Sequence, residues 1–176
     1  METAFPMPQR DIVLYPDAPL REVAQPIEVF DKKLRMLVDD MFQTMYAHEG
    51  VGLAAPQVGV ARRLFVLHEP EGKPMCLVNP RIVESEGNEP GHEGCLSLPE
   101  MSYENIPRAT RILVDAQDPH GESLRFEAND FLARIIQHEN DHLDGVMCFD
   151  RLDILSRQAA IQEWEDYRLS HYPARA

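Results

Sequence analysis

The sequence predicts an α+β fold, in which antiparallel β-sheets pack around a central helix and a further helix lies toward each end of the chain. Two observations support this. Segments rich in β-branched and apolar residues follow one another in runs, and helices do not alternate with them. Three stretches instead repeat apolar residues at three- and four-residue steps, the helical period. At 176 residues the chain is expected to form one domain, residues 1–176, with a substantial core.

The N-terminal helix is expected after a loose arm at residues 1–11, which has turn-forming residues and no periodicity. Asp31 is a suitable N-cap, and Gly50 follows the end of the pattern. Its apolar stripe indicates core packing and consists of Leu34, Leu37, Val38, Met41, Phe42 and Met45.

A glycine-rich apolar segment follows at residues 50–59. Gly50 and Gly52 would let a ligand approach the backbone closely, and Gln57 is the one polar side chain among them. The alternative is a tight connection in which Gln57 hydrogen-bonds its own loop. No Gly-Lys-Ser/Thr follows, so a phosphate loop is excluded.

Strands are predicted at residues 63–68 and 75–83, which are apolar and β-branched. Residues 111–117 and 122–127 alternate around a turn at 118–121 and predict a β-hairpin. This hairpin leads directly into the central helix.

The central helix carries His-Glu-x-x-His. His138 and His142 are four residues apart, so both rings lie on one face and can reach one metal ion. Glu139 lies about 100° around the helix, where it can contact a water on that ion as a general base. The alternative is that the histidines are ordinary polar residues of a half-buried helix. Buried beside Glu139 and Asp141, however, they would be difficult to satisfy without an ion.

The boundaries and the apolar face of this helix can also be predicted. Asn129 or Asp130 offers an N-cap, and Gly145 a C-terminal stop. The helix is apolar over much of its circumference and is expected to be buried, through Phe131, Leu132, Ile135, Ile136 and Leu143.

A last helix is predicted over about 156–172, with Pro173 after its end. Its inner stripe would be Ala159, Ala160, Trp164, Tyr167 and Leu169.

The three cysteines are an odd number at wide spacing, which does not resemble a disulfide framework and suggests a reducing compartment. Cys76 and Cys148 lie among apolar residues and are expected to be inert. Cys95 lies in a glycine-containing loop at 91–99 and could provide a soft thiolate ligand. Taken alone, it would more readily be a buried structural cysteine.

The net charge of −13 argues against binding to nucleic acid or to anionic membranes. No run of about 18 apolar residues predicts a transmembrane helix, and the first residues do not resemble a secretion signal. We therefore expect a cytoplasmic protein with no DNA and no membrane among its partners.

Three segments together resemble, in order, the signature motifs of bacterial peptide deformylases of the type 1-like group. They are residues 50–57 (GVGLAAPQ), 93–97 (EGCLS) and 137–142 (QHENDH). The similarity extends from about Asp11 to Arg157 and includes Pro107-Arg108-Ala109.

The resemblance implies that Cys95 joins His138 and His142 as the third metal ligand, with water in the fourth position. It also implies Fe²⁺ as the preferred ion, with Zn²⁺, Ni²⁺ or Co²⁺ possible in purified protein. The softness of the Cys/His/His set alone would favour zinc.

The implied reaction removes the formyl group from the N-terminal formyl-methionine of nascent chains and releases formate. Glu139 would move the proton, while the Gln57 side chain and the Leu96 backbone N–H would stabilise the oxyanion.

Substrate binding is expected along the backbone of Val51, Gly52 and Gly94, with Phe131 and Ile135 as walls of the methionine pocket. The family also suggests an ion pair between Glu93 and Arg108 that holds the Cys95 loop. For Asp141, a supporting partner of the site and a plain surface carboxylate are equally expected.

This sequence differs from the pattern of the family in two segments. No arginine occurs between Pro99 and Pro107, where many relatives carry one, which puts contacts to residues beyond the methionine in doubt. The C-terminal segment 157–176 also balances Arg157, Arg168 and Arg175 against Glu163, Glu165 and Asp166. A helix without excess positive charge matches ribosomal RNA poorly, so a transient ribosome association is only weakly supported.

Two other interpretations remain. An endopeptidase with the same helix motif would be expected to show a downstream His or Glu ligand, and none stands out. A structural metal module would have four protein ligands and no need of Glu139.

Overall fold

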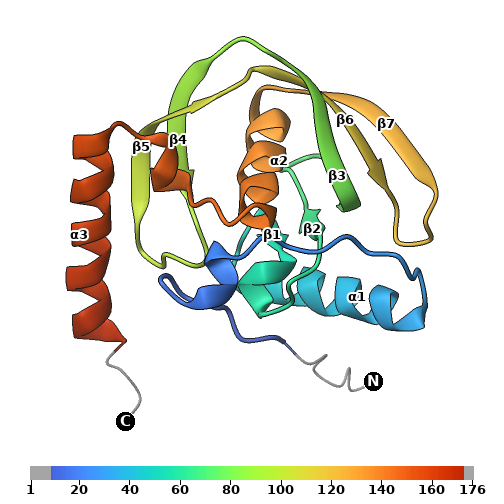
Figure 1. Cartoon of the computed structure of the whole chain (residues 1–176), viewed down its shortest axis with the longest axis horizontal. Helices are drawn as coiled ribbons and strands as arrows, with labels where there is room; N and C mark the ends of the chain where they lie inside the picture. Colours follow the sequence, from blue (N-terminus) through green and yellow to red (C-terminus); the bar gives the residue numbers. More distant parts are fainter. Residues whose placement is uncertain (1–8, 173–176) are drawn as a thin grey trace.

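The computed structural model describes residues 9–172, so most of the predicted arm at 1–11 lies outside the described residues, as do Pro173 and Arg175. Figure 1 shows helix α2 in the middle of the molecule, with strands above and beside it and α3 at one edge. The helices are α1 (Lys32–Ala47), α2 (Asp130–Leu143) and α3 (Ile154–His171), with short 3₁₀ turns η1 (Ala18–Arg21), η2 (Ala55–Val58) and η3 (Cys148–Arg151). The strands are β1 (Gly52–Ala54), β2 (Leu64–Leu67), β3 (Met75–Glu86), β4 (Glu89–Gly94), β5 (Ser102–Arg108), β6 (Arg111–Gln117) and β7 (Ser123–Asn129).

The strands form two antiparallel sheets. One has five strands in the order β1-β2-β3-β6-β7, and the other consists of β4 and β5. The predicted α+β class is confirmed, and so is the hairpin, seen as β6 paired with β7. Strands β1, β4 and β5 were not predicted from the sequence.

Strand β2 shows how the core divides into layers. Leu64 and Val66 face a cluster that contains α1, whereas Phe65 and Leu67 face a cluster that contains α2. Because side chains alternate along a strand, this short segment is buried on both faces. A third cluster joins β5, η3 and α3. Helix α2 is thus held by the five-stranded sheet on one side.

The helix boundaries follow local chemistry. The Asp31 carboxylate accepts a hydrogen bond from the Leu34 N–H at 3.0 Å, as expected of the N-cap of α1. Helix α2 begins after Asn129, whose side chain makes no cap hydrogen bond, and Gly145 follows its end with φ of +71°. The expectation that α2 is buried over much of its circumference was too broad, because Phe131 is 46% exposed.

Helix α3 begins two residues before the predicted Ser156, where Asp153 accepts hydrogen bonds from Leu155 and Ser156. Ala160 and Trp164 are buried, but Ala159 and Leu169 are exposed and the predicted stripe was wrong there. The Trp164 indole N–H donates to the Tyr15 carbonyl at 2.8 Å. This bond ties α3 to the segment before η1.

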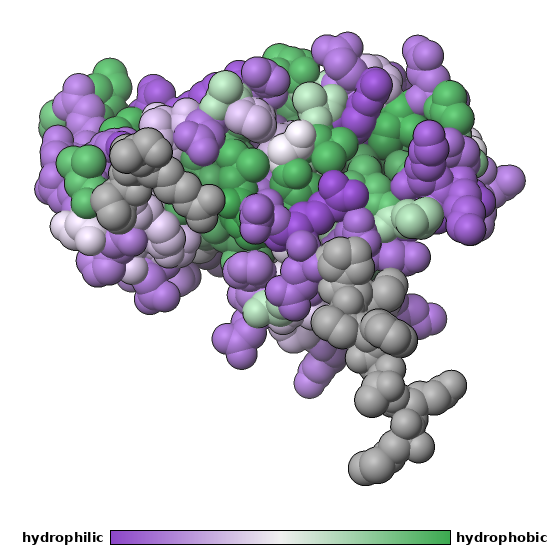
Figure 2. Space-filling view, turned by 90° about the horizontal axis from the view of Figure 1, so that it is seen from below, coloured by the Kyte–Doolittle hydropathy of each residue, from purple (hydrophilic) through white to green (hydrophobic). Residues whose placement is uncertain are grey.

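Figure 2 shows hydrophilic residues over much of this face, and hydrophobic residues grouped in its middle and along parts of its upper edge. Among the helices within residues 9–172, none is long and apolar enough to cross a membrane.

Candidate metal centre

Three potential metal ligands converge between α2 and the loop after β4. The Cys95 Sγ lies 3.4 Å from the His142 Nε2, which lies 3.3 Å from the His138 Nε2. All three ligand atoms lie within 4.8 Å of one another. The histidines meet because they are one turn apart on α2, and β4 delivers Cys95 to the same point.

This donor set fits a divalent transition metal. A thiolate and two imidazole nitrogens are soft to borderline ligands, and three protein donors leave a position for water or substrate. Both histidines are buried, and their Nε2 atoms face each other and the sulfur. An ion at this point would be bound by lone pairs of the Cys95 Sγ and of the two Nε2 atoms.

The orientation of the His138 ring is fixed by a hydrogen bond from Nδ1, the ring nitrogen that does not face the candidate metal centre. Its Nδ1 lies 2.7 Å from the Glu93 Oε2, and because a carboxylate only accepts, we assign the hydrogen to Nδ1. The Nε2 lone pair is then free for a metal, which is the common arrangement for a ligating histidine.

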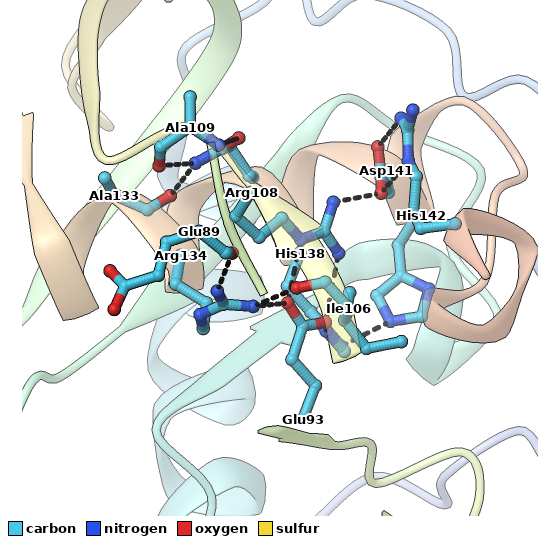
Figure 3. A network of polar contacts seen from close by, with 12 residues as sticks. Glu89, Glu93, Ile106, Arg108, Ala109, Ala133, Arg134, His138, Asp141 and His142 are labelled. Atoms are coloured by element: carbon cyan, nitrogen blue, oxygen red, sulfur yellow. Dashed lines mark hydrogen bonds and ion pairs between the residues drawn. The ribbon is translucent and has the colours of Figure 1, made fainter. Parts of the chain in front are cut away.

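Arg108 links Glu93 to Asp141 in a buried network (Figure 3). Its Nε and Nη2 donate to Glu93 at 2.7 and 3.0 Å, and its Nη1 donates to Asp141 at 2.6 Å. Arg151 donates to the same Asp141 at 3.0 and 2.6 Å. Asp141 is only 5% exposed. Of the two expectations for this residue, the structure therefore favours the supporting partner over the surface carboxylate.

The network controls the charge of Glu93. Burial alone would raise its pKa, but hydrogen bonds from His138 and Arg108 outweigh burial and hold the pKa well below the usual range. Glu93 is therefore ionised at neutral pH, as an acceptor for the His138 N–H must be.

Glu139 lies on α2 next to His138 and is 4% exposed. Its Oε2 is buried and has no hydrogen-bond partner among the described residues. Burial raises the pKa of this carboxyl to about 7. A β-carbon on Gly52 would lie 2.4 Å from the Glu139 Oε1, so strand β1 can pass Glu139 only because residue 52 is glycine.

Gln57 combines the two roles considered for it. Its Oε1 accepts from the Ala54 N–H at 2.9 Å, within its own loop. Its Nε2 donates to the Ser97 Oγ at 3.2 Å and lies 3.6 Å from the Cys95 Sγ. The side chain therefore holds its own turn and points an N–H group toward the candidate metal centre.

A cleft of about 1460 Å³ opens over this centre. Every residue predicted to contact substrate lines it, namely Val51, Gly52, Gly94, Phe131 and Ile135. Leu96 lines it as well. So do His48, Arg134, Arg168 and Tyr172, which sequence reasoning did not place at the site.

Residues 9–158 match the family model described as polypeptide deformylase. A peptide deformylase of Hydrogenovibrio crunogenus is 46% identical over 161 residues, which cover 90% of this chain and 95% of the relative. The chain belongs to the polypeptide deformylase family.

Solved deformylase structures have the same fold. That of Thermus thermophilus superposes with a TM-score of 0.87 at 42% identity, covering 92% of this chain and 96% of the other. That of Legionella pneumophila gives 0.87 at 38% identity, covering 96% and 100%. The predicted family is confirmed, together with its activity as a metal-dependent hydrolase that removes an N-terminal formyl group.

Within this deformylase fold, sequence reasoning did not assign three arginines to the site. Arg151 supports Asp141, Arg134 contacts Glu93 at 3.0 Å, and Arg168 lines the cleft from α3. Arg134 is one turn before His138 on the helix, and that spacing was the available signal.

Proposed function

We propose that this deformylase acts on the formyl-methionine of newly synthesised polypeptides in the cytoplasm, with Cys95, His138 and His142 as metal ligands. The observation that supports the proposal most directly is the convergence of these three side chains beside the buried carboxylate of Glu139. A divalent ion held there supplies Lewis-acid chemistry to an amide carbonyl and to water.

We propose Fe²⁺ as the ion in the cell, on the resemblance to the family. The donor set itself also accommodates Zn²⁺, Ni²⁺ or Co²⁺. The metal content of anaerobically purified protein, measured by mass spectrometry, tests this choice, and zinc as the dominant ion of fully active protein would contradict it.

Glu139 is assigned the proton transfers. As a carboxylate it accepts a proton from the water that attacks the formyl carbon, and it then returns the proton to the leaving amine. The buried Oε2 of Glu139 has no hydrogen-bond partner among the described residues, so this oxygen is free to take up and return the proton.

The negative charge that develops on the formyl oxygen needs hydrogen-bond donors. The Gln57 amide, directed toward Cys95 at 3.6 Å, supports this assignment. The backbone N–H of Leu96, next to Cys95 and on the lining of the cleft, is the second proposed donor.

We place the substrate as an extended segment along Val51, Gly52 and Gly94, so that its backbone adds to the edges of β1 and β4. The methionine side chain would then lie against Phe131 and Ile135. A half-exposed phenylalanine in a cleft is a suitable apolar wall, because substrate would cover surface that is otherwise in water.

Ribosome association remains a weak proposal. Arg168, one of the basic residues of α3, is paired with Glu165 at 2.7 Å, so its charge is locally compensated. Salt-dependent pelleting with ribosomes would test it. Equal pelleting of the full chain and of a chain lacking residues 157–176 would exclude this helix as the contact.

The decisive experiment measures formate release from formyl-Met-Ala-Ser. The protein is prepared anaerobically with ferrous iron and compared with Glu139→Ala that still holds one metal. We expect activity only in the unchanged protein. Metal bound one-to-one without formate release would instead favour the structural module, and internal cleavage of unformylated peptides would favour the endopeptidase.

A further inference from the structure

Arg134 makes contacts that the activity described above does not explain. Its Nη1 donates to the Glu93 Oε1 at 3.0 Å and to the Ile106 carbonyl at 2.9 Å, and its Nη2 donates to the Glu89 carbonyl at 2.8 Å. Figure 3 shows the guanidinium reaching from α2 toward Glu93 and Glu89. One side chain of α2 thus bonds to both strands of the β4–β5 sheet.

These bonds lie where the β4–β5 ladder is irregular. The register shifts between Gly91 and Glu93, and such a shift locally disrupts the ladder. Arg134 provides donors to backbone carbonyls on either strand beside it, from Glu89 and Ile106. The guanidinium therefore bonds to β4 on both sides of the register shift, at the Glu89 carbonyl and at the Glu93 carboxylate, just before the chain reaches Cys95.

The backbone of β4 leaves space for this guanidinium. A β-carbon at Gly91 would lie 2.5 Å from both the Cζ and the Nη2 of Arg134. Because the obstructing atoms are the end of a flexible side chain, a larger residue at 91 would displace the arginine before it displaced the strand. Gly91 and Arg134 therefore depend on each other.

Glu93 joins this contact to the metal ligands. Its Oε1 accepts from Arg108 and Arg134, and its Oε2 accepts from Arg108 and from the His138 Nδ1. Arg108 is 4% exposed, whereas the Arg134 side chain is 13% exposed and lines the cleft. Glu93 and Arg134 both line the cleft, and Arg134 is the more exposed of the two arginines that bond to Glu93.

We propose that Arg134 is a positioning residue: it fixes the Cys95 strand relative to the α2 histidines and holds Glu93 on His138. The proposal deepens the proposed function and rests on it, because it concerns the same metal centre. The Arg134 stem, next to Phe131 and Ile135 on the helix, also forms part of the cleft wall.

The test uses protein loaded with Co²⁺, whose thiolate charge-transfer band reports the geometry of the sulfur ligand. Arg134→Met keeps an apolar stem and removes the guanidinium. We expect an altered band, release of cobalt to a chelator that is about 10- to 100-fold faster, and a kcat lower by a similar factor. The KM for a formyl-methionyl peptide should change by less than about threefold, since the stem is retained.

Two further variants keep the test decisive if Arg134→Met does not fold. Arg134→Lys keeps the charge and one donor, so it should fall between the unchanged protein and Arg134→Met. Gly91→Ala keeps the arginine but displaces it, so it should reproduce the effects of Arg134→Met. The double variant should be no worse than the more severe single variant, because both remove the same contact.

The matched control is Arg125→Met, which removes an arginine that donates to Asp115 at 2.5 and 2.7 Å and is 65% exposed on β7. It should leave the cobalt band and the release rate unchanged. If Arg134→Met or Gly91→Ala lowers only the melting temperature and leaves both readouts unchanged, the positioning role is overturned. The positioning role would also be overturned if the effects of Arg134→Met and Gly91→Ala on cobalt release multiplied in the double variant.

The outcomes separate this inference from the proposed function. Formate release is measured on the unchanged protein, while cobalt release and the cobalt band need no peptide. Absence of formate release with the expected cobalt effects would reject the proposed function and support the role of Arg134. Normal formate release without the cobalt effects would support the proposed function and reject the role of Arg134.

Discussion

The side chain of Glu139 occupies the space that a β-carbon of Gly52 would need, at 2.4 Å from its Oε1. Strand β1 therefore lies directly against the proposed general base. Since the obstructing atoms belong to a buried side chain on α2, a larger residue at 52 must move either that carboxylate or the strand.

Gly52→Ala should lower kcat by about 100- to 10,000-fold, because general-base catalysis typically contributes that factor and needs the carboxylate in place. The metal content should stay near one ion per chain, since none of the ligands is touched. Formate release and metal analysis on the same sample measure both. A kcat equal to that of the unchanged protein would show that Glu139 does not need its present position.

Gln57→Leu should lower kcat by about 100- to 1,000-fold through loss of one oxyanion donor. Ser97→Ala is the matched control, because it removes a partner of the Gln57 Nε2 and leaves the amide itself. Steady-state kinetics should show a much smaller effect for Ser97→Ala. If both variants lose kcat equally, Gln57 acts chiefly by holding its loop.

Arg108→Met should destabilise the protein by up to about 3–5 kcal/mol, the usual cost of removing one partner of a buried ion pair. Arg134 still bonds to Glu93 and Arg151 to Asp141, so the loss should not exceed this range. The side chains of Arg108, Glu93 and Asp141 are all at most 7% exposed, so water cannot replace the arginine. Urea unfolding of the metal-free protein gives the value. Arg125→Met, which breaks an exposed pair, should cost under about 1 kcal/mol, and a similar loss in both variants would contradict the reasoning.

Cys76 gives a prediction at alkaline pH. Burial raises the pKa of its thiol from 9.0 to about 12, with a smaller effect of Asp118. The folded chain then binds more protons than the unfolded chain between these values, so stability is retained below pH about 9 and falls as the pH rises toward 12. Urea midpoints between pH about 8 and about 11 should fall less steeply for Cys76→Ala. Parallel curves for the two proteins would show that the thiol does not contribute.

The sequence was most informative where the determinants are local. The cap of α1 by Asp31, the β6–β7 hairpin and the meeting of His138 with His142 all depend on residues a few positions apart. The periodicity of α2 correctly located the helix that carries the histidines. These features required no knowledge of distant contacts.

What the sequence did not reveal depends on partners far along the chain. Strands β4 and β5 are short, contain glycine, proline and charged residues, and are defined by pairing with each other. Arg134 meets Glu93 41 residues away, and local spacing does not identify that partner. Cys95 was assigned as a ligand only through the family resemblance, because no spacing rule joins it to α2.

The bond from Trp164 to the Tyr15 carbonyl spans 149 positions of the sequence. During translation this bond cannot form until nearly all of the described chain has been made, whereas α1 and the β6–β7 hairpin can form from neighbouring residues as they emerge. Because α3 and the residue after it also supply Arg168 and Tyr172 to the cleft, the outer wall of the cleft is assembled last. An enzyme proposed to act on nascent chains would thus complete its own substrate cleft only late in its own synthesis.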